Sequence, residues 1–100
     1  MARLLVLYKT PKDVAAFDKH YAQTHIPLAK KIPGPRKYEV SQGTVMTPAG
    51  PSGVHLVATL HFDDVKAIQS AFASAEGEAA GADAQSLSSV DMLIFDSKEV

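Results

Sequence analysis

The sequence predicts an α+β protein of ferredoxin-like βαββαβ order, with a four-stranded antiparallel sheet that carries its helices on one face. Two observations lead to this fold. Patterns typical of strands flank each of two amphipathic helix patterns, and clusters of Pro, Gly and Ser separate the segments in the middle of the chain. The length of 100 residues and an apolar fraction of 46% fit one globular domain over residues 1–100.

The first strand and the first helix are both expected near the start of the chain. Residues 3–9 form a short apolar segment of the kind that suits a buried strand. Thr10 is expected to cap the helix that follows, because its hydroxyl can accept from free backbone amides and Pro11 suits the first helical position. An apolar stripe with helical spacing runs through Val14, Phe17, Tyr21 and Leu28.

Pro27 predicts where this helix ends. A proline disfavours helical geometry at the residue before it, so the regular helix should end near Thr24 or His25. A short extra turn over residues 27–32 is expected next, and the Pro-Gly-Pro sequence after it is a firm stop.

Residues 36–45 and 54–62 alternate as strands do, with a loop over residues 46–53 between them. The face that should meet the helices carries Val54, Leu56, Ala58, Leu60 and Phe62. The opposite face carries His55, Val57, Thr59 and His61. A half-apolar, uncovered sheet face is an association surface, so we expect a homodimer in which two such sheets enclose a barrel.

The last third of the chain supplies a second helix and the fourth strand. Residues 63–74 carry a helical stripe and should be capped by Asp63 or Asp64. The Ala- and Gly-rich residues 75–88 are expected to form a loose loop or a broken short helix, and residues 89–100 contain the last strand.

Composition and motifs exclude several classes of function. A net charge of −1 with no basic patch gives no support for nucleic-acid binding, and the absence of Cys excludes thiolate chemistry. The apolar run Leu4–Tyr8 is too short for a secretory signal or a membrane span, so we expect a cytoplasmic protein with no membrane contact. No dinucleotide or phosphate-binding glycine motif occurs, so no cofactor is predicted.

His25 is the leading candidate for chemistry, and we expect its ring to look into the hollow that the two uncovered sheet faces enclose. An imidazole titrates near neutral pH and can accept and donate a proton in turn. Tyr21 lies one turn before it, and a phenol beside an imidazole is a suitable pair for holding an enol or phenol oxygen. The alternative is structural: His25 caps carbonyls freed by Pro27, and Tyr21 is an ordinary core residue.

Three further residues are candidates for ligand binding. His61 and Thr59 share the uncovered strand face, which would line the barrel. Tyr8 points either to the barrel or to the helices. His20 and His25 are five residues apart, a poor fit to two ligands on one helix face, so no metal site is predicted.

The central motif resembles the EthD family, whose pattern is matched here by Tyr21, His25, Pro27, Leu28, Pro33, Gly34 and Tyr38. The resemblance covers almost the whole chain. It implies a dimeric α+β barrel of two ferredoxin-like subunits, in a family named after a protein of ethyl tert-butyl ether breakdown by a cytochrome P450 system and often labelled reductase. Pro35 departs from the family, which usually has a bulky residue after Pro-Gly.

Three functions remain open at this point, because the fold does not fix the activity. The first is an enzyme, oxidoreductase- or monooxygenase-like or else cyclase- or isomerase-like, acting on a small apolar or aromatic oxygenated molecule. His25 would be its acid/base and Tyr21 its hydrogen-bond donor. The second is a non-catalytic carrier that is accessory to a monooxygenase system, and the third is a structural dimer without a ligand.

Overall fold

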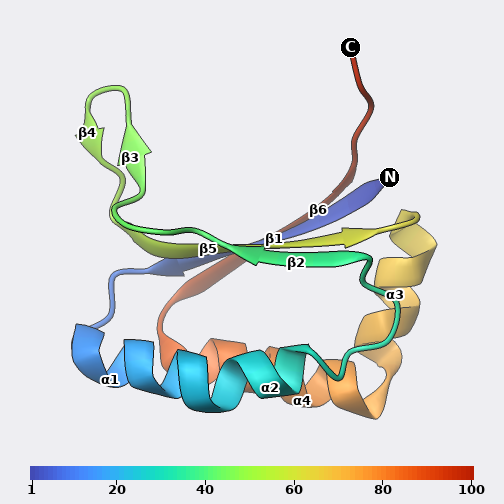
Figure 1. Cartoon of the computed structure of the whole chain (residues 1–100), viewed down its shortest axis with the longest axis horizontal. Coiled ribbons are helices and arrows are strands. Elements are labelled where there is room, and N and C mark those ends of the chain that lie inside the picture. The colour runs from blue at the N-terminus through green and yellow to red at the C-terminus, as the bar shows by residue number, and fades with distance from the viewer.

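The computed structural model describes all residues 1–100 and has two layers, a sheet and a set of helices on one of its faces (Figure 1). The sheet is antiparallel with the order β2-β5-β1-β6. Its strands are β1 (Ala2–Lys9), β2 (Lys37–Val40), β5 (Val54–Phe62) and β6 (Val90–Asp96). This arrangement confirms the predicted ferredoxin-like α+β fold, with β1 and β5 in the centre of the sheet.

The helices come from two stretches of the chain. The first stretch holds α1 (Val14–His20), a π-helical turn η1 (Tyr21–His25) and α2 (Ile26–Ala29), which follow one another without a break. The second holds α3 (Val65–Ala73) and α4 (Ala75–Leu87). No helix of the chain combines the length and the apolar character that crossing a membrane requires.

Pro27 does not end the first helical stretch, so the predicted helix end near Thr24 or His25 was wrong, whereas the short extra turn expected after it is present as α2. Ile26 has φ −57° and ψ −47°, which is regular helical geometry. Its N–H reaches back to the carbonyl of Tyr21, one residue further than in an α-helix. Pro27 then lies in the first turn of α2, where a missing N–H and a fixed φ are tolerated.

The helix caps also differ in part from the sequence-based expectation. Asp13, not Thr10, caps α1, with its carboxylate accepting from the Ala16 N–H at 3.0 Å. Thr10 instead donates its hydroxyl to the Gly53 carbonyl. At α3 the cap is Asp64, one of the two residues predicted for that position.

The segment predicted as a long second strand is shorter than expected. Strand β2 ends at Val40, and a small hairpin of β3 (Met46–Thr47) and β4 (Gly50–Pro51) follows inside the predicted loop. This hairpin and the C-terminal residues both project from the side of the sheet that the helices leave open (Figure 1).

Residues 75–88 are not a loop, because α4 occupies almost all of them and is the longest helix of the chain. The small residues Gly77, Ala80 and Ala84 are its buried positions. A Cβ at Gly77 would lie 2.1 Å from the Ala71 carbonyl oxygen, so only glycine allows α4 to approach α3 this closely. Small residues therefore set the distance between these helices.

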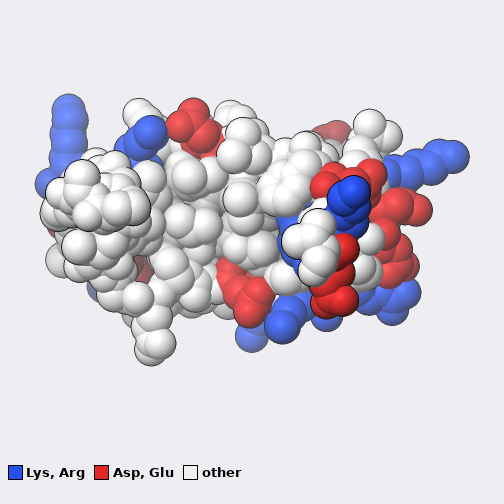
Figure 2. Space-filling view, turned by 90° about the horizontal axis from the view of Figure 1, so that it is seen from above, with Lys and Arg blue, Asp and Glu red and all other residues white.

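The two faces of the sheet differ as the alternation of the strands predicts. Ala2, Leu4, Val6 and Tyr8 of β1 are buried beneath the helices. The uncovered face bears Arg3, Leu5, Leu7, Lys37, Glu39, Val57, Thr59, His61, Asp91, Leu93 and Phe95. Seen from this side, the middle of the molecule is largely free of charge, and charged residues gather toward one end and along the rim (Figure 2).

His55 is an exception to the predicted alternation. The pairing of β1 with β5 shifts between Tyr8 and Lys9, so that Tyr8 opposes Leu56 and Lys9 opposes Val54. His55 is the extra residue of this bulge, and its ring lies 5.0 Å from the ring of Phe17 on α1. The prediction that His55 belongs to the uncovered face is therefore wrong.

Candidate active site

His25 lies between the helices and the sheet, where it is 5% exposed and is buried together with Tyr8 and Tyr21. Its ring stacks on that of Tyr21, with centroids 4.9 Å apart and planes at 30°. It therefore faces the helix-covered side of the sheet. The expectation that His25 looks into a hollow between two uncovered sheet faces is wrong, because the sheet stands between His25 and that hollow.

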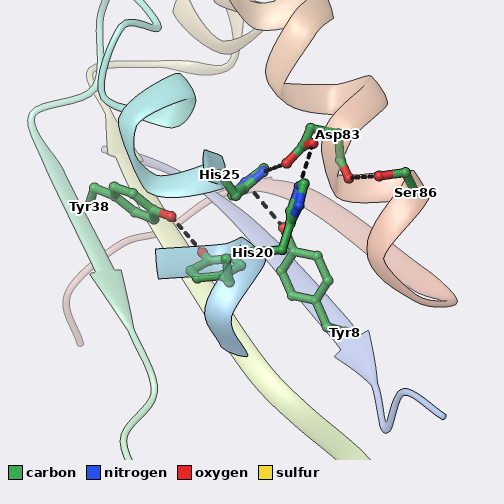
Figure 3. A network of polar contacts seen from close by, with 7 residues as sticks. Tyr8, His20, His25, Tyr38, Asp83 and Ser86 are labelled. Carbon is green, nitrogen blue, oxygen red and sulfur yellow. Dashed lines mark hydrogen bonds and ion pairs between the residues drawn. The ribbon is translucent and has the colours of Figure 1, made fainter. Parts of the chain in front are cut away.

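Asp83 on α4 joins two histidines of the first helical stretch (Figure 3). One carboxylate oxygen lies 2.9 Å from Nδ1 of His25, and the other lies 2.8 Å from Nε2 of His20. Burial acts to raise the pKa of Asp83, but the hydrogen bonds from His20 and His25 outweigh it and leave that pKa below its ordinary value. Asp83 is thus a carboxylate at neutral pH.

This ionised carboxylate fixes the protonation of both rings. A carboxylate can only accept hydrogen bonds, so the ring nitrogens that face Asp83 both carry hydrogen. In neutral His25 the proton is then on Nδ1, and Nε2 has a free lone pair. This pattern, a histidine held by a carboxylate with its other nitrogen available, is the one that general bases use.

The π-helical turn explains why both histidines reach one carboxylate. His20 and His25 are five residues apart, and a π turn makes backbone bonds from residue i to i−5. The extra residue in the turn brings this spacing onto one side of the helix. The sequence-based judgement that the spacing does not fit one face assumed a regular α-helix. No group of three potential ligand side chains converges to hold a metal ion.

Tyr8 of β1 provides the contact on the other side of the His25 ring. Its hydroxyl is 3.3 Å from Nε2 of His25. Burial, followed by the nearby Tyr38 and the Asp83 charge, raises the pKa of Tyr8, so the hydroxyl remains protonated and donates to Nε2. The contact is longer than a usual O–H···N bond, so an incoming oxygen can replace it.

Tyr21 and Tyr38 form a second hydroxyl pair beside the histidine, with their oxygens 2.5 Å apart. Burial is the main cause that raises the pKa of each phenol. The ring of Tyr21 therefore stacks on the ring of His25, and its hydroxyl is hydrogen-bonded to the hydroxyl of Tyr38. The phenol whose hydroxyl contacts the His25 ring is that of Tyr8, whereas the sequence pointed to Tyr21 as this hydrogen-bond donor.

A small cavity adjoins these groups. Its volume is about 20 Å³, and His25, Tyr8 and Tyr38 line it together with apolar residues that include Val6, Ala58 and Leu60. A space of this size holds about one water-sized group. The cavity thus presents a base and two phenols to a single small atom or group in apolar surroundings.

The structure does not bring His61 and Thr59 to this site. Both lie on the uncovered face, opposite Arg3 and Leu5 of β1. Nε2 of His61 is 2.7 Å from a carboxylate oxygen of Glu39 on the neighbouring strand. Of the predicted ligand-binding residues, only Tyr8 shares a cavity with His25.

Asp83 is the residue of this site that the sequence analysis missed. It lies in the Ala- and Gly-rich segment that was expected to be either a loose loop or a broken short helix. A usable signal exists once the segment is read as a helix. Asp83 then comes three residues after Ala80 and directly before Ala84, both of which are buried, so it stands at the edge of the buried helix face.

Comparisons with known proteins agree with this fold. The profile of the EthD domain matches residues 9–90. An uncharacterized 11.0 kDa protein of the thcB–thcC intergenic region of Rhodococcus erythropolis is 34% identical, with the match covering 100% of this chain and 98% of that protein.

Solved structures extend the comparison. An ethyl tert-butyl ether (EthD) family protein from Bacillus halodurans superposes with a TM-score of 0.90 at 36% identity, covering 98% of this chain and 99% of the other. Two more distant structures share the fold. SnoaB, a cofactor-independent oxygenase from Streptomyces nogalater, has a TM-score of 0.68 at 16% identity, covering 99% and 94%. A dimeric protein of ferredoxin-like fold from Bacteroides fragilis has a TM-score of 0.65 at 22% identity, covering 95% and 94%. With its profile match and its two relatives above 30% identity, this chain belongs to the EthD family.

Proposed function

We propose that this protein is an enzyme that moves a proton on a small apolar or aromatic oxygenated molecule, with His25 as the acid/base. The observation that carries the proposal is the buried ring of His25, held at Nδ1 by Asp83 and turned at Nε2 toward Tyr8 and an apolar cavity. A histidine that served only as a helix cap would bond backbone carbonyls, but both its ring nitrogens meet side chains here.

The chemistry follows from these contacts. The oxygen of a ketone, an enol or a phenol would take the place of Nε2 as the acceptor of the Tyr8 O–H. Nε2 would then remove a proton from the neighbouring carbon or hydroxyl, and the bonding electron pair would move onto the substrate as an enolate or phenolate. The negative charge of Asp83 stabilises the imidazolium that forms, and the imidazolium returns the proton in the second half of the reaction.

The comparisons are consistent with this class of activity. SnoaB, which shares the fold, is a cofactor-independent oxygenase, and the Bacillus halodurans relative carries the ethyl tert-butyl ether family name. Enolates and phenolates are electron-rich, so proton removal is a reasonable first step toward oxidation of such a molecule. The oxidation itself would need molecular oxygen or a partner enzyme as oxidant.

The proposal includes a homodimer that pairs through the uncovered sheet face. Leu5, Leu7, Val57, Leu93 and Phe95 supply its apolar surface. The B. fragilis protein of the same fold is dimeric. Pairing would bury His61 and Thr59 between the two sheets, so a role for these two residues in ligand binding stays a prediction that depends on the second copy.

Hydrogen exchange of a simple ketone tests the proposed chemistry. Butanone is incubated with the protein in D₂O, and mass spectrometry follows deuterium uptake at the carbons next to the carbonyl. We expect the wild type to accelerate uptake and His25→Ala to lose about 10²–10⁴-fold of that acceleration, the usual share of a general base. His55→Ala is the matched control, because His55 lines neither the cavity at His25 nor the uncovered sheet face, and it should retain the rate.

Binding measured in parallel separates an enzyme from a carrier. If His25→Ala binds butanone but no longer catalyses exchange, the enzyme proposal holds. If neither form catalyses exchange and both bind equally, the proposal fails and the carrier function takes its place.

A further inference from the structure

A groove on the surface borders the small cavity at His25. It lies between α3, α4 and the helix-facing side of β6, and its volume is about 670 Å³. Leu4, Phe72, Gly81 and Met92 line both the groove and the inner cavity. The two spaces therefore meet at these four residues, and the groove has the size of a site for a small molecule.

Most residues that line the groove are apolar. Ile68 and Ile94 are among them, together with the methionine and phenylalanine that also line the inner cavity. Gln69, Glu78 and Gln85 are exposed side chains around it. No Lys or Arg lines either space, so neither offers a partner for an anionic ligand.

We propose that the ligand is an elongated, neutral molecule with a carbonyl or hydroxyl oxygen at one end. That end reaches His25 and Tyr8 in the inner cavity, and an apolar tail passes between Phe72, Gly81 and Met92 into the groove. The inference rests on the proposed function, because that function places the oxygen at His25. The sizes support it, since the inner cavity of about 20 Å³ holds only the polar end.

Two features allow the junction to serve as a passage. A Cβ built at Gly81 meets no atom within 4 Å, so the helix leaves open space there. Met92 is 38% exposed, and a methionine side chain has three rotatable bonds with which it can move aside. The groove also lies on the helix-covered side of β6, so pairing through the uncovered face leaves it free.

Gly81→Leu is the variant that closes the passage. Its side chain would enter the open space instead of displacing packed atoms, and leucine is a better helix former than glycine, so the variant should fold. Ala79→Leu is the matched control, because it adds a leucine to the same helix at an exposed position that lines neither space.

The experiment is a titration with unbranched methyl ketones from butanone to decanone, followed by the NMR signals of the His25 ring. In the wild type and in Ala79→Leu we expect the affinity to rise roughly fourfold for each added methylene, as burial of that group predicts. In Gly81→Leu the rise with chain length should stop, because the tail can no longer extend into the groove. The carboxylate of the same length as decanone should bind at least tenfold more weakly than decanone.

An affinity that does not change with chain length in the wild type would overturn the inference. So would a rise that persists in Gly81→Leu, or a carboxylate that binds as well as the ketone. None of these readouts needs turnover. If the ketones bind with the expected length dependence and no hydrogen exchange is catalysed, the acid/base function fails and the ligand class stands.

Discussion

Two of the four histidine–carboxylate pairs of the molecule lie on opposite faces of the sheet, and their contact distances are nearly equal. His25 and Asp83 are 2.9 Å apart beneath the helices, with side chains 7% and 15% exposed. His61 and Glu39 are 2.7 Å apart on the uncovered face, with side chains 16% and 51% exposed. The shorter contact is thus the more exposed one, so distance does not tell which pair is built for chemistry.

The surroundings of the two pairs distinguish them. The second nitrogen of His25 faces a phenol and an apolar cavity. Glu39 has Lys37 as a further partner at 3.8 Å and is open to solvent, which weakens each of its ion pairs. Its pKa is lowered mainly by the hydrogen bond from His61. A lowered carboxylate pKa therefore occurs on both faces and does not by itself mark a site.

The most direct test of the difference between the two pairs is to replace each carboxylate with an amide. Asp83→Asn should reduce ketone hydrogen exchange by about 10²-fold, because the amide can no longer stabilise the imidazolium of His25. It should also shift the ¹⁵N signals of His25 toward the other tautomer, which a purely structural role would not do. Glu39→Gln should leave both the exchange rate and the His25 tautomer unchanged.

Equal losses of activity in these two variants would remove the distinction between the pairs. A normal exchange rate in Asp83→Asn would show that His25 needs no carboxylate, and the proposed role of Asp83 would then be wrong.

The second prediction concerns the apolar surface of the uncovered sheet face. Leu93 and Ile94 are neighbours on β6, both 51% exposed, and they point to opposite faces of the sheet. Leu93→Lys should weaken self-association by at least tenfold in sedimentation experiments, because it places a charge in the surface that pairs. Ile94→Lys, on the helix-facing side, should leave the dimer intact. A wild-type protein that is monomeric at micromolar concentration would contradict the proposed dimer.

Much of this two-faced architecture could be predicted from the sequence. The alternation over residues 54–62 gave the strand with its observed bounds and assigned Thr59 and His61 to the uncovered face. Strong period-two and helical patterns made of large apolar residues produced these predictions. His55 was misplaced because a bulge is a local change of register that no alternation pattern reveals.

The active-site half was harder to predict for two physical reasons. The buried face of α4 consists of Gly and Ala, so it lacks the large apolar residues on which a helical stripe is recognised, and Asp83 was lost with it. The spacing of His20 and His25 has meaning only on a π turn, and a single sequence carries no clear signal for one. Both missed features, α4 and the π turn, belong to the elements that meet at His25.

Substitutions at the two glycines of α4 test the packing of the helix that carries Asp83. Gly77→Ala should lower the free energy of unfolding by about 1–3 kcal/mol, because its methyl group would overlap the backbone of Ala71 and Phe72. Gly81→Ala should raise it by up to about 1 kcal/mol, because the space is open and alanine favours the helix. Chemical denaturation of both variants measures the difference, and equal effects would contradict the described packing of α3 and α4.

The smallest expected effect is on the pH dependence of stability. The pKa of Asp83 is lower in the folded protein than the ordinary value of about 3.9 in an unfolded chain. Its stabilising contribution is therefore complete above about pH 5 and is lost as the pH falls through the unfolded and then the lower, folded value. The difference in free energy of unfolding between the wild type and Asp83→Asn should accordingly shrink between about pH 5 and pH 2. For Glu39→Gln the same difference should stay below detection throughout, because solvent screens that carboxylate. A difference that grows as the pH falls would mean that Asp83 is destabilised as a carboxylate in the folded protein, and the assignment of both ring protons to His20 and His25 would then have to be reversed.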